Sequence, residues 1–206
     1  MRAKPRESGS FGELLAAALD GVCELSSKQI AELEAHYDLL QRWNQRMNLT
    51  AVHSMQEAVV RHYGESVFLA KVIRDLGGAE SSIVDLGSGA GFPGVPIAVV
   101  LPAAQITLVE ANHRKAAFLK ESTRALPNIS VLAKRSGDVE GFWAWMVSRA
   151  VRSGDVLAAA KRLASRIALL TSAGVRPADS DVNWHLPIPL PWSDSVVLVG
   201  DVPRGT

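Results

Sequence analysis

Four closely spaced glycines, Gly87, Gly89, Gly91 and Gly94, follow a short apolar run that contains Asp85. Glycine has no Cβ, so a loop that is rich in it lets the backbone approach a bound ligand closely. The helix expected after the loop presents free N–H groups at its start. A strand, a glycine loop and a helix in this order are typical of a site for a nucleotide-like cofactor.

The glycine spacing alone fits two classes of cofactor. The last three glycines match the G-x-G-x-x-G spacing of dinucleotide sites, and the first three match the G-x-G-x-G spacing common in methyltransferases. Asp85 favours the second class, because a carboxylate there would repel a pyrophosphate but suits the ammonium and sulfonium charges of S-adenosylmethionine. Glu110, at the end of the next expected strand, can accept hydrogen bonds from the ribose hydroxyls of either cofactor. We therefore expect a methyltransferase, with an NAD-dependent oxidoreductase as the alternative.

The residues from Ser82 onward alternate between short apolar runs and longer amphipathic stretches. Strands are expected at 83–86, 105–110, 129–133, 145–148, 167–171 and 195–202, and helices at 93–101, 112–126 and 155–164. This alternation predicts an α/β fold with a doubly wound, mostly parallel sheet and helices on both faces, as in Rossmann-like class I methyltransferases. The last segment is rich in proline, and Trp184 and Trp192 are expected to cover the sheet.

The residues before the sheet predict an N-terminal helical extension. From Leu25 to Leu49, apolar residues recur at intervals of three and four. Ser26 and Gln29 have the form of a capping box. Ser54 opens a second helix, which runs toward Leu76 before two glycines end it.

Length and composition complete this expectation. In a chain of 206 residues we expect a disordered or loosely ordered lead-in (1–24), a helical cap (25–78) and an S-adenosylmethionine-binding domain (79–206) that forms one compact unit with the cap. The single cysteine, Cys23, precludes an internal disulfide and favours a reducing compartment. The apolar runs are shorter than the ~20 residues that span a bilayer, and the five histidines have no metal-ligand spacing. We expect a cytoplasmic monomer without a metal or a membrane partner.

Several motifs occur in the order known from one family. They are Leu39–Val52, Arg61-His62, Asp85–Pro96 with its Phe-Pro-Gly-x-Pro tail, Leu108–Ala111 and Ser148-Arg149-Ala150. Together they resemble the bacterial small-subunit rRNA guanine-N7 methyltransferases called RsmG or GidB, over roughly residues 25–150. The C-terminal part is unlike that family.

The resemblance implies an S-adenosylmethionine-dependent enzyme that methylates N7 of a guanine in small-subunit (16S) rRNA or in a ribosomal particle. It implies that Arg149 and His62 are candidate substrate-side residues. Because guanine N7 carries a lone pair and no proton, the reaction needs no general base. With the residues argued above, the expected cofactor-binding set is Asp85, Gly87, Gly89, Gly91, Phe92, Glu110, Ser136, Gly137 and Arg149.

RNA binding needs positive charge near the cofactor crevice. The candidate RNA-binding residues are Arg42, Arg46, Arg61, Arg114, Lys115 and Arg135. The chain departs from the family at Ser136-Gly137, where an Ala-Glu pair is usual, and at Gly64-Glu65-Ser66, where an Asp-Ser pair is usual. A diverged module that binds cofactor or RNA without transferring methyl is therefore a further alternative. A small-molecule methyltransferase on the same core is another.

Overall fold

The protein is described by a computed structural model that covers residues 9–52, 54–149, 153–175 and 181–203. The strands are β1 (Ser82–Leu86), β2 (Gln105–Val109), β3 (Ile129–Leu132), β4 (Trp143–Arg149), β5 (Ala164–Ser172), β6 (Asn183–Trp184), β7 (Ile188–Pro189) and β8 (Ser195–Asp201). The helices are α1 (Phe11–Ala18), α2 (Ser27–Met47), α3 (Met55–Ala58), the π-helix η1 (Val59–Gly64), α4 (Glu65–Asp75), α5 (Gly94–Val100), α6 (His113–Ser122), the 3₁₀ turn η2 (Ser136–Asp138) and α7 (Ser153–Leu163).

All the strands join one sheet, in the order β3-β2-β1-β4-β5-β8-β6, with β7 also paired to β8. The strands β1 to β5 are parallel, and β8 runs antiparallel to β5. The strand order reverses between β1 and β4, and ligands bind beside the carboxyl ends of the strands at such a point. The start of β8 belongs to the same edge, because Ser195 pairs with Ser172 at the end of β5. The expected mostly parallel sheet is confirmed.

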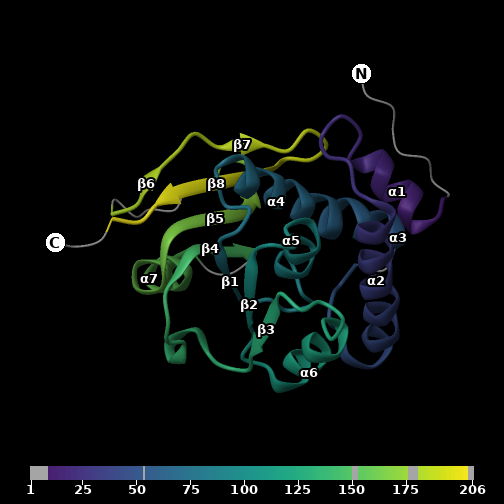
Figure 1. Ribbon diagram of the computed structural model, residues 1–206, viewed down its shortest axis with the longest axis horizontal. Helices are drawn as coiled ribbons and strands as arrows, with labels where there is room; N and C mark the ends of the chain where they lie inside the picture. The colour runs from purple at the N-terminus through teal and green to yellow at the C-terminus, as the bar shows by residue number, and fades with distance from the viewer. Residues whose placement is uncertain (1–8, 53, 150–152, 176–180, 204–206) are drawn as a thin grey trace.

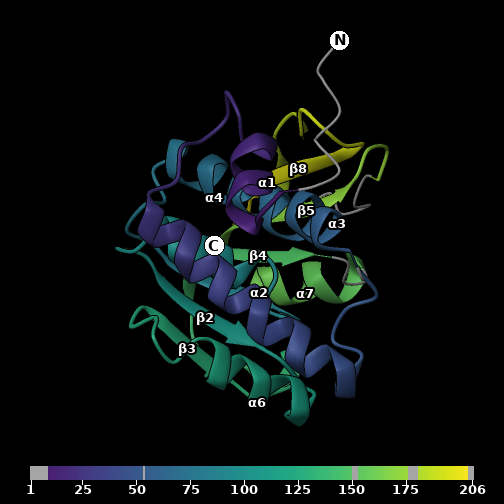
Figure 2. The same ribbon diagram turned by 90° about the vertical axis from the view of Figure 1, so that its right-hand side faces the viewer.

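The two faces of the sheet are covered unequally, as Figures 1 and 2 show. Helices α1, α2, α4, α5 and α6 contribute to the larger core on one face. On the other face, α7 packs on β4 and β5 around a smaller core. Helix α2 lies across α6, where Trp43 and Phe118 place their ring centroids 5.7 Å apart. The helical extension thus shares its core with the sheet.

The N-terminal region contains an ordered helix that the sequence did not lead us to expect. In α1, Ser10 forms a capping box with Glu13, and the Phe11 side chain is buried. The Phe11 ring centroid lies 5.4 Å from that of Tyr37 and 5.0 Å from that of Tyr63. The expectation of a disordered or loosely ordered lead-in over residues 1–24 is therefore wrong for 11–18, and residues 1–8 lie outside the described residues.

The second expected helix is divided by a π-helix. Ser54 caps its start, accepting a hydrogen bond from Glu57 N at 3.1 Å, but the chain then passes from α3 through η1 into α4. The first helix begins as expected, with the capping box of Ser26 and Gln29 formed. Short π-helical turns inside α-helices are frequent at functional sites. None of the described helices is long and apolar enough to cross a membrane.

The C-terminal segment extends the sheet. Strands β6 and β7 both pair with β8 at its edge, as Figure 1 shows along the top of the molecule. Trp192 packs against Phe68 of α4, with ring centroids 5.9 Å apart. Trp184 lies in β6 itself, so of the two tryptophans expected to cover the sheet, one is part of it.

Candidate functional site

The glycine loop leaves β1 at the carboxyl edge of the sheet. Gly87, Gly89 and Gly91 all have positive φ, at 77°, 57° and 93°. A Cβ added to Gly89 would meet no atom nearer than the Gly87 oxygen, at 3.8 Å, so it would project into open space. A Cβ on Gly91 would lie 3.0 Å from His36 Nε2, and one on Gly94 would lie 2.3 Å from Leu108 Cδ2. Gly89 thus borders open space, whereas Gly91 and Gly94 are needed for close packing.

Glu110 follows β2 and faces this loop. Its Oε2 accepts a hydrogen bond from Gly89 N at 2.9 Å, and its Oε1 accepts one from Asn112 N at 2.7 Å. The Asn112 side chain in turn caps α6 by accepting from Arg114 N and Lys115 N. Each carboxylate oxygen keeps a further lone pair for a ligand. The backbone therefore holds the Glu110 carboxylate at the loop.

Asp85 lies beneath the loop and is completely buried. Its Oδ2 accepts a hydrogen bond from Gly94 N at 3.0 Å, and its Oδ1 has no partner in the described structure. Burial raises the pKa of Asp85 to about 7, and the hydrogen bond from Gly94 opposes this shift. Asp85, which in the sequence favoured a cationic ligand, thus lies directly under the loop with one carboxylate oxygen that has no hydrogen-bond partner in the described structure.

Phe92 is buried in an aromatic cluster that joins the loop to the helical extension. Its ring stacks on His62 at 4.8 Å and meets the edges of His36 at 5.5 Å and Tyr63 at 5.0 Å, measured between centroids. Burial lowers the pKa of both His36 and His62 to about 4, and for His62 the positive charges of Arg149 and Arg61 add to the shift. Both imidazoles are therefore neutral at pH 7. A direct contact between Phe92 and a cofactor remains a prediction.

Arg149 ends β4 and joins three elements at the edge. Its Nη2 lies 2.8 Å from Glu65 Oε2, and its Nη1 donates to the backbone carbonyl of Arg61. The preceding Ser148 donates to the Leu86 carbonyl at 2.9 Å, which ties β4 to the start of the glycine loop. The Ser-Arg part of the expected motif is thus beside the loop; Ala150 lies outside the described residues. Sequence reasoning missed Glu65, although the departure from the family pattern at this position was a signal.

Ser136 and Gly137 lie in η2, which follows β3. The guanidinium of Arg162, in α7, donates to the Ser136 carbonyl at 2.7 Å and also to the Val139 carbonyl. A Cβ on Gly137 would have no neighbour within 4 Å. The pair is therefore held by its backbone at the same end of the sheet, and Arg162 is a second residue that the sequence did not reveal.

The candidate RNA-binding residues lie on several elements around this edge. Arg42 and Arg46 are exposed on α2, Arg114 and Lys115 are in the first turn of α6, and Arg135 immediately precedes η2. Arg61 differs, because it is exposed but forms an ion pair with Glu57 at 2.9 Å.

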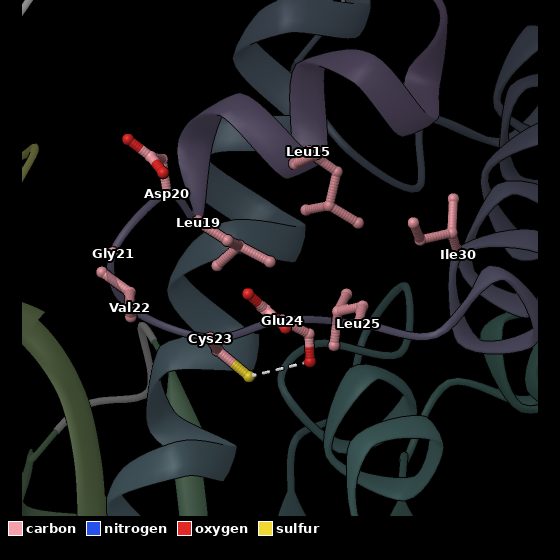
Figure 3. Close-up of a pocket in the computed structure, with 10 residues that line it drawn as sticks. Leu15, Leu19, Asp20, Gly21, Val22, Cys23, Glu24, Leu25 and Ile30 are labelled. Carbon is pink, nitrogen blue, oxygen red and sulfur yellow. Dashed lines mark hydrogen bonds between the residues drawn. The ribbon is translucent and has the colours of Figure 1, made fainter.

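A separate cavity of about 460 Å³ lies between α1 and α2. Figure 3 shows Leu15, Leu19, Leu25 and Ile30 around it, with Cys23 directed toward the backbone carbonyl of Glu24. None of the expected site residues lines it. Within the described ranges, no cluster of three His, Cys, Asp or Glu side chains could hold a metal ion. The carboxyl edge is therefore the candidate site.

The strand order, the antiparallel strand beside β5 and the glycine loop define a Rossmann-like methyltransferase fold. The magnesium protoporphyrin IX methyltransferase ChlM from Synechocystis PCC 6803, solved with bound SAM, is similar to this chain with a TM-score of 0.61 and 13% identity, over 88% of this chain and 99% of that chain. Residues 29–171 match the family described as rRNA small subunit methyltransferase G (GidB), and the chain belongs to this family.

Relatives that carry the name ribosomal RNA small subunit methyltransferase G include proteins from Stenotrophomonas maltophilia and Xylella fastidiosa. The one from Stenotrophomonas maltophilia is 35% identical over 161 residues, which is 72% of either chain. The one from Xylella fastidiosa is 39% identical over 117 residues, which covers 56% of this chain but only 53% of the relative. The resemblance found in the sequence motifs is thus confirmed at the level of the family.

Proposed function

We propose that this protein transfers a methyl group from S-adenosylmethionine to N7 of a guanine in small-subunit rRNA. The observation that supports this most directly is the glycine loop at the carboxyl edge, with Asp85 beneath it and Glu110 held against it. Membership of the rRNA small subunit methyltransferase G family supports the RNA substrate. The choice of guanine N7 is carried over from the family resemblance.

The residues at the edge fit S-adenosylmethionine. Next to Gly89 there is open space, which a cofactor can occupy, and Glu110 can accept hydrogen bonds from the ribose hydroxyls. The buried Asp85, whose Oδ1 is unpartnered and whose pKa is about 7, would ionise when a cationic ligand binds and would then give the loop a negative potential. Gly87 and Gly91 would shape the loop around the donor, and Ser136 and Gly137 would lie near the adenine. Bound there, the cofactor supplies an electrophilic methyl group.

The protein's contribution to the reaction is orientation. Guanine N7 needs no deprotonation, so the enzyme must align the base with the methyl group, and such alignment can contribute about 7–11 kcal/mol. Arg149 donates to the Arg61 carbonyl of the π-helix, and His62 belongs to that helix and stacks on Phe92 of the glycine loop. These two side chains would form the wall against which the base is placed. His62 is held neutral, so it would add no charge to this wall.

RNA would approach across the basic residues that surround the edge. Arg42, Arg46, Arg114, Lys115, Arg135 and the exposed Arg61 would contact phosphates, while the target guanine is splayed out of its stack. Rossmann-like sheets bind their ligands at this same edge, so the basic residues would hold the RNA beside the bound cofactor. We further propose that the protein acts as a monomer in the cytoplasm.

The test is a methyl-transfer assay with the purified chain, labelled S-adenosylmethionine and small-subunit particles that lack the modification. We expect label in N7-methylguanosine, identified by mass spectrometry of the digested rRNA. Label on another base, or on protein alone, would contradict the substrate. Thermal stabilisation by NAD and not by S-adenosylmethionine would contradict the cofactor. Donor binding without transfer to any RNA would indicate the diverged module.

A further inference from the structure

Glu65 links three elements at the carboxyl edge. It is the first residue of α4 and only 3% exposed. Its Oε2 pairs with Arg149 at 2.8 Å, and its Oε1 accepts hydrogen bonds from Ser195 Oγ at 3.0 Å and Ser193 Oγ at 3.3 Å. A buried carboxylate is costly unless it is paired and hydrogen-bonded. Here the end of β4, the first residue of β8 and the segment just before β8 provide those partners.

Arg149 lies close to a second positive charge, that of Arg61. Burial lowers the pKa of the Arg149 guanidinium, and the charge of Arg61 lowers it further. Its guanidinium donates to the Arg61 carbonyl, and its charge lowers the pKa of His62, which stacks on Phe92 of the glycine loop. Arg61 has its own acidic partner, Glu57, on the exposed side of the helix. Among the residues that the structure describes, Glu65 is therefore the acid that pairs with Arg149.

Methylation at N7 makes this neutralisation important. The N7 lone pair forms the new bond to the methyl carbon, and the electron pair of the broken carbon–sulfur bond returns to sulfur. No proton moves. The positive charge therefore passes from the sulfonium to the base, and an unpaired arginine beside the base would oppose that transfer.

We propose that Glu65 is a positioning residue for methyl transfer, which holds Arg149 at the base side of the site and cancels its charge while the base becomes cationic. This inference rests on the proposed function, because it concerns the base side of the same site. It assigns a purpose to the acid at the position where the chain departs from the usual family motif. The serines of the C-terminal segment, which is unlike the family, complete the same arrangement.

The test compares Glu65→Gln, Glu65→Asp and the wild type in the methyl-transfer assay, with separate measurements of the Kd for S-adenosylmethionine and for rRNA. For Glu65→Gln we expect kcat to fall by about tenfold to a hundredfold, while the KM for rRNA stays the same or falls, because the site becomes more positive. Glu65→Asp keeps the charge and should recover part of kcat. A merely structural defect would instead weaken the binding of donor and RNA together.

Asp201→Asn is the matched control. Asp201 pairs with Arg166 at 3.0 Å, but this ion pair lies at the opposite edge of the sheet. Removing the Asp201 charge should therefore leave kcat unchanged. The single variant Glu65→Gln leaves Arg149 without its acidic partner and could fail to fold for that reason. The double variant Glu65→Gln/Arg149→Gln buries no unpaired charge and is used in that case. Because Glu65 acts through Arg149, the double variant should match Arg149→Gln in kcat, and a further loss would overturn the inference.

The outcomes separate the two proposals. A wild-type protein that labels no guanine overturns the proposed function and this inference with it. An active wild type beside a folded Glu65→Gln variant of equal kcat overturns this inference alone.

Discussion

Glu110 Oε2 accepts a hydrogen bond from Gly89 N at 2.9 Å, so the acid that ends β2 supports the glycine loop that follows β1. The two residues come from neighbouring parallel strands and meet at the carboxyl edge. Since Oε1 accepts from Asn112 N at 2.7 Å, the carboxylate has one orientation, and it is fixed by backbone groups alone. Glu110 is thus both a support of the loop and a candidate ribose ligand.

We predict that Glu110→Gln weakens the binding of S-adenosylmethionine by roughly tenfold to a hundredfold, because a hydrogen bond to a charged group contributes about 1.5–3 kcal/mol. The amide of the substituted glutamine would have to direct its NH₂ group at one of the two backbone N–H donors, so one of the two hydrogen bonds would be lost. Titration calorimetry with S-adenosylmethionine and with S-adenosylhomocysteine measures the effect. The affinity for both ligands should fall by the same factor, since both contain the ribose. A loss confined to the sulfonium compound would contradict the assignment, and Glu121→Gln, on the exposed side of α6, is the control.

Gly89→Ala should reduce cofactor affinity by at least about tenfold while costing about 1–2 kcal/mol of stability for the positive φ. The added methyl group would occupy the open space at the loop. Gly77→Ala is a matched control, because Gly77 also has a positive φ, 84°, and a Cβ added to it would have no neighbour within 4 Å. Melting temperatures of both variants should fall similarly. Equal affinity of Gly89→Ala and wild type for the donor would count against the position of the cofactor.

The features that sequence patterns predicted well are local. The capping box of Ser26 and Gln29, the strand before Gly87 and the acid after β2 each depend on residues close in sequence, and the structure has all of them. The mostly parallel sheet followed from the alternation of short apolar runs with amphipathic stretches.

The features that were missed depend on distant residues. Glu65 and Arg149 are far apart in the chain, so no local spacing reveals that they pair. The π-helix has residues that an α-helix also accommodates, so the sequence does not distinguish the two. The helix that begins at Phe11 was missed because polar residues precede it and because its stability comes from packing on Tyr37 and Tyr63. The burial of Phe92 likewise results from the helices that cover it. Its predicted contact with the cofactor, like the other site assignments, remains a prediction.

The buried Asp85 should make stability and cofactor binding depend on pH. Its pKa in the folded protein, about 7, is above the ordinary value of 3.8 for an aspartate. The stability that the protonated form contributes is therefore complete below pH 3.8 and is lost as the pH rises to 7. Asp85→Asn should therefore gain stability relative to wild type over this range, as measured by urea unfolding. A cationic donor should lower the pKa of Asp85, so binding near pH 7 should release a proton in wild type. Calorimetry in buffers of different ionisation enthalpy would detect it, and equal proton release by Asp85→Asn would contradict the role of this group.

The buried histidines act in the opposite direction. The pKa of both His36 and His62, about 4, is below the ordinary histidine value of 6.5. The stability that these neutral groups contribute is therefore complete above pH 6.5 and is lost as the pH falls to 4. His62→Gln should reduce the steepness of acid unfolding between these limits. His113→Gln, at an exposed residue, is the control. An unchanged acid profile in His62→Gln would show that this imidazole is not kept neutral by the fold.

The proposed RNA surface predicts a difference between the two ends of α6. Arg114 lies in its first turn at the carboxyl edge, and Arg135 lies beside η2, whereas Arg124 follows the helix at the opposite edge. Each phosphate contact contributes about 0.7–0.9 to the slope of log K against log salt concentration. Arg114→Gln/Arg135→Gln should therefore lower the slope for small-subunit rRNA by about 1.4–1.8. Arg124→Gln/Lys120→Gln removes the same net charge at the far edge and should change the slope little. Equal slopes for the two double variants would mean that the RNA does not approach the carboxyl edge.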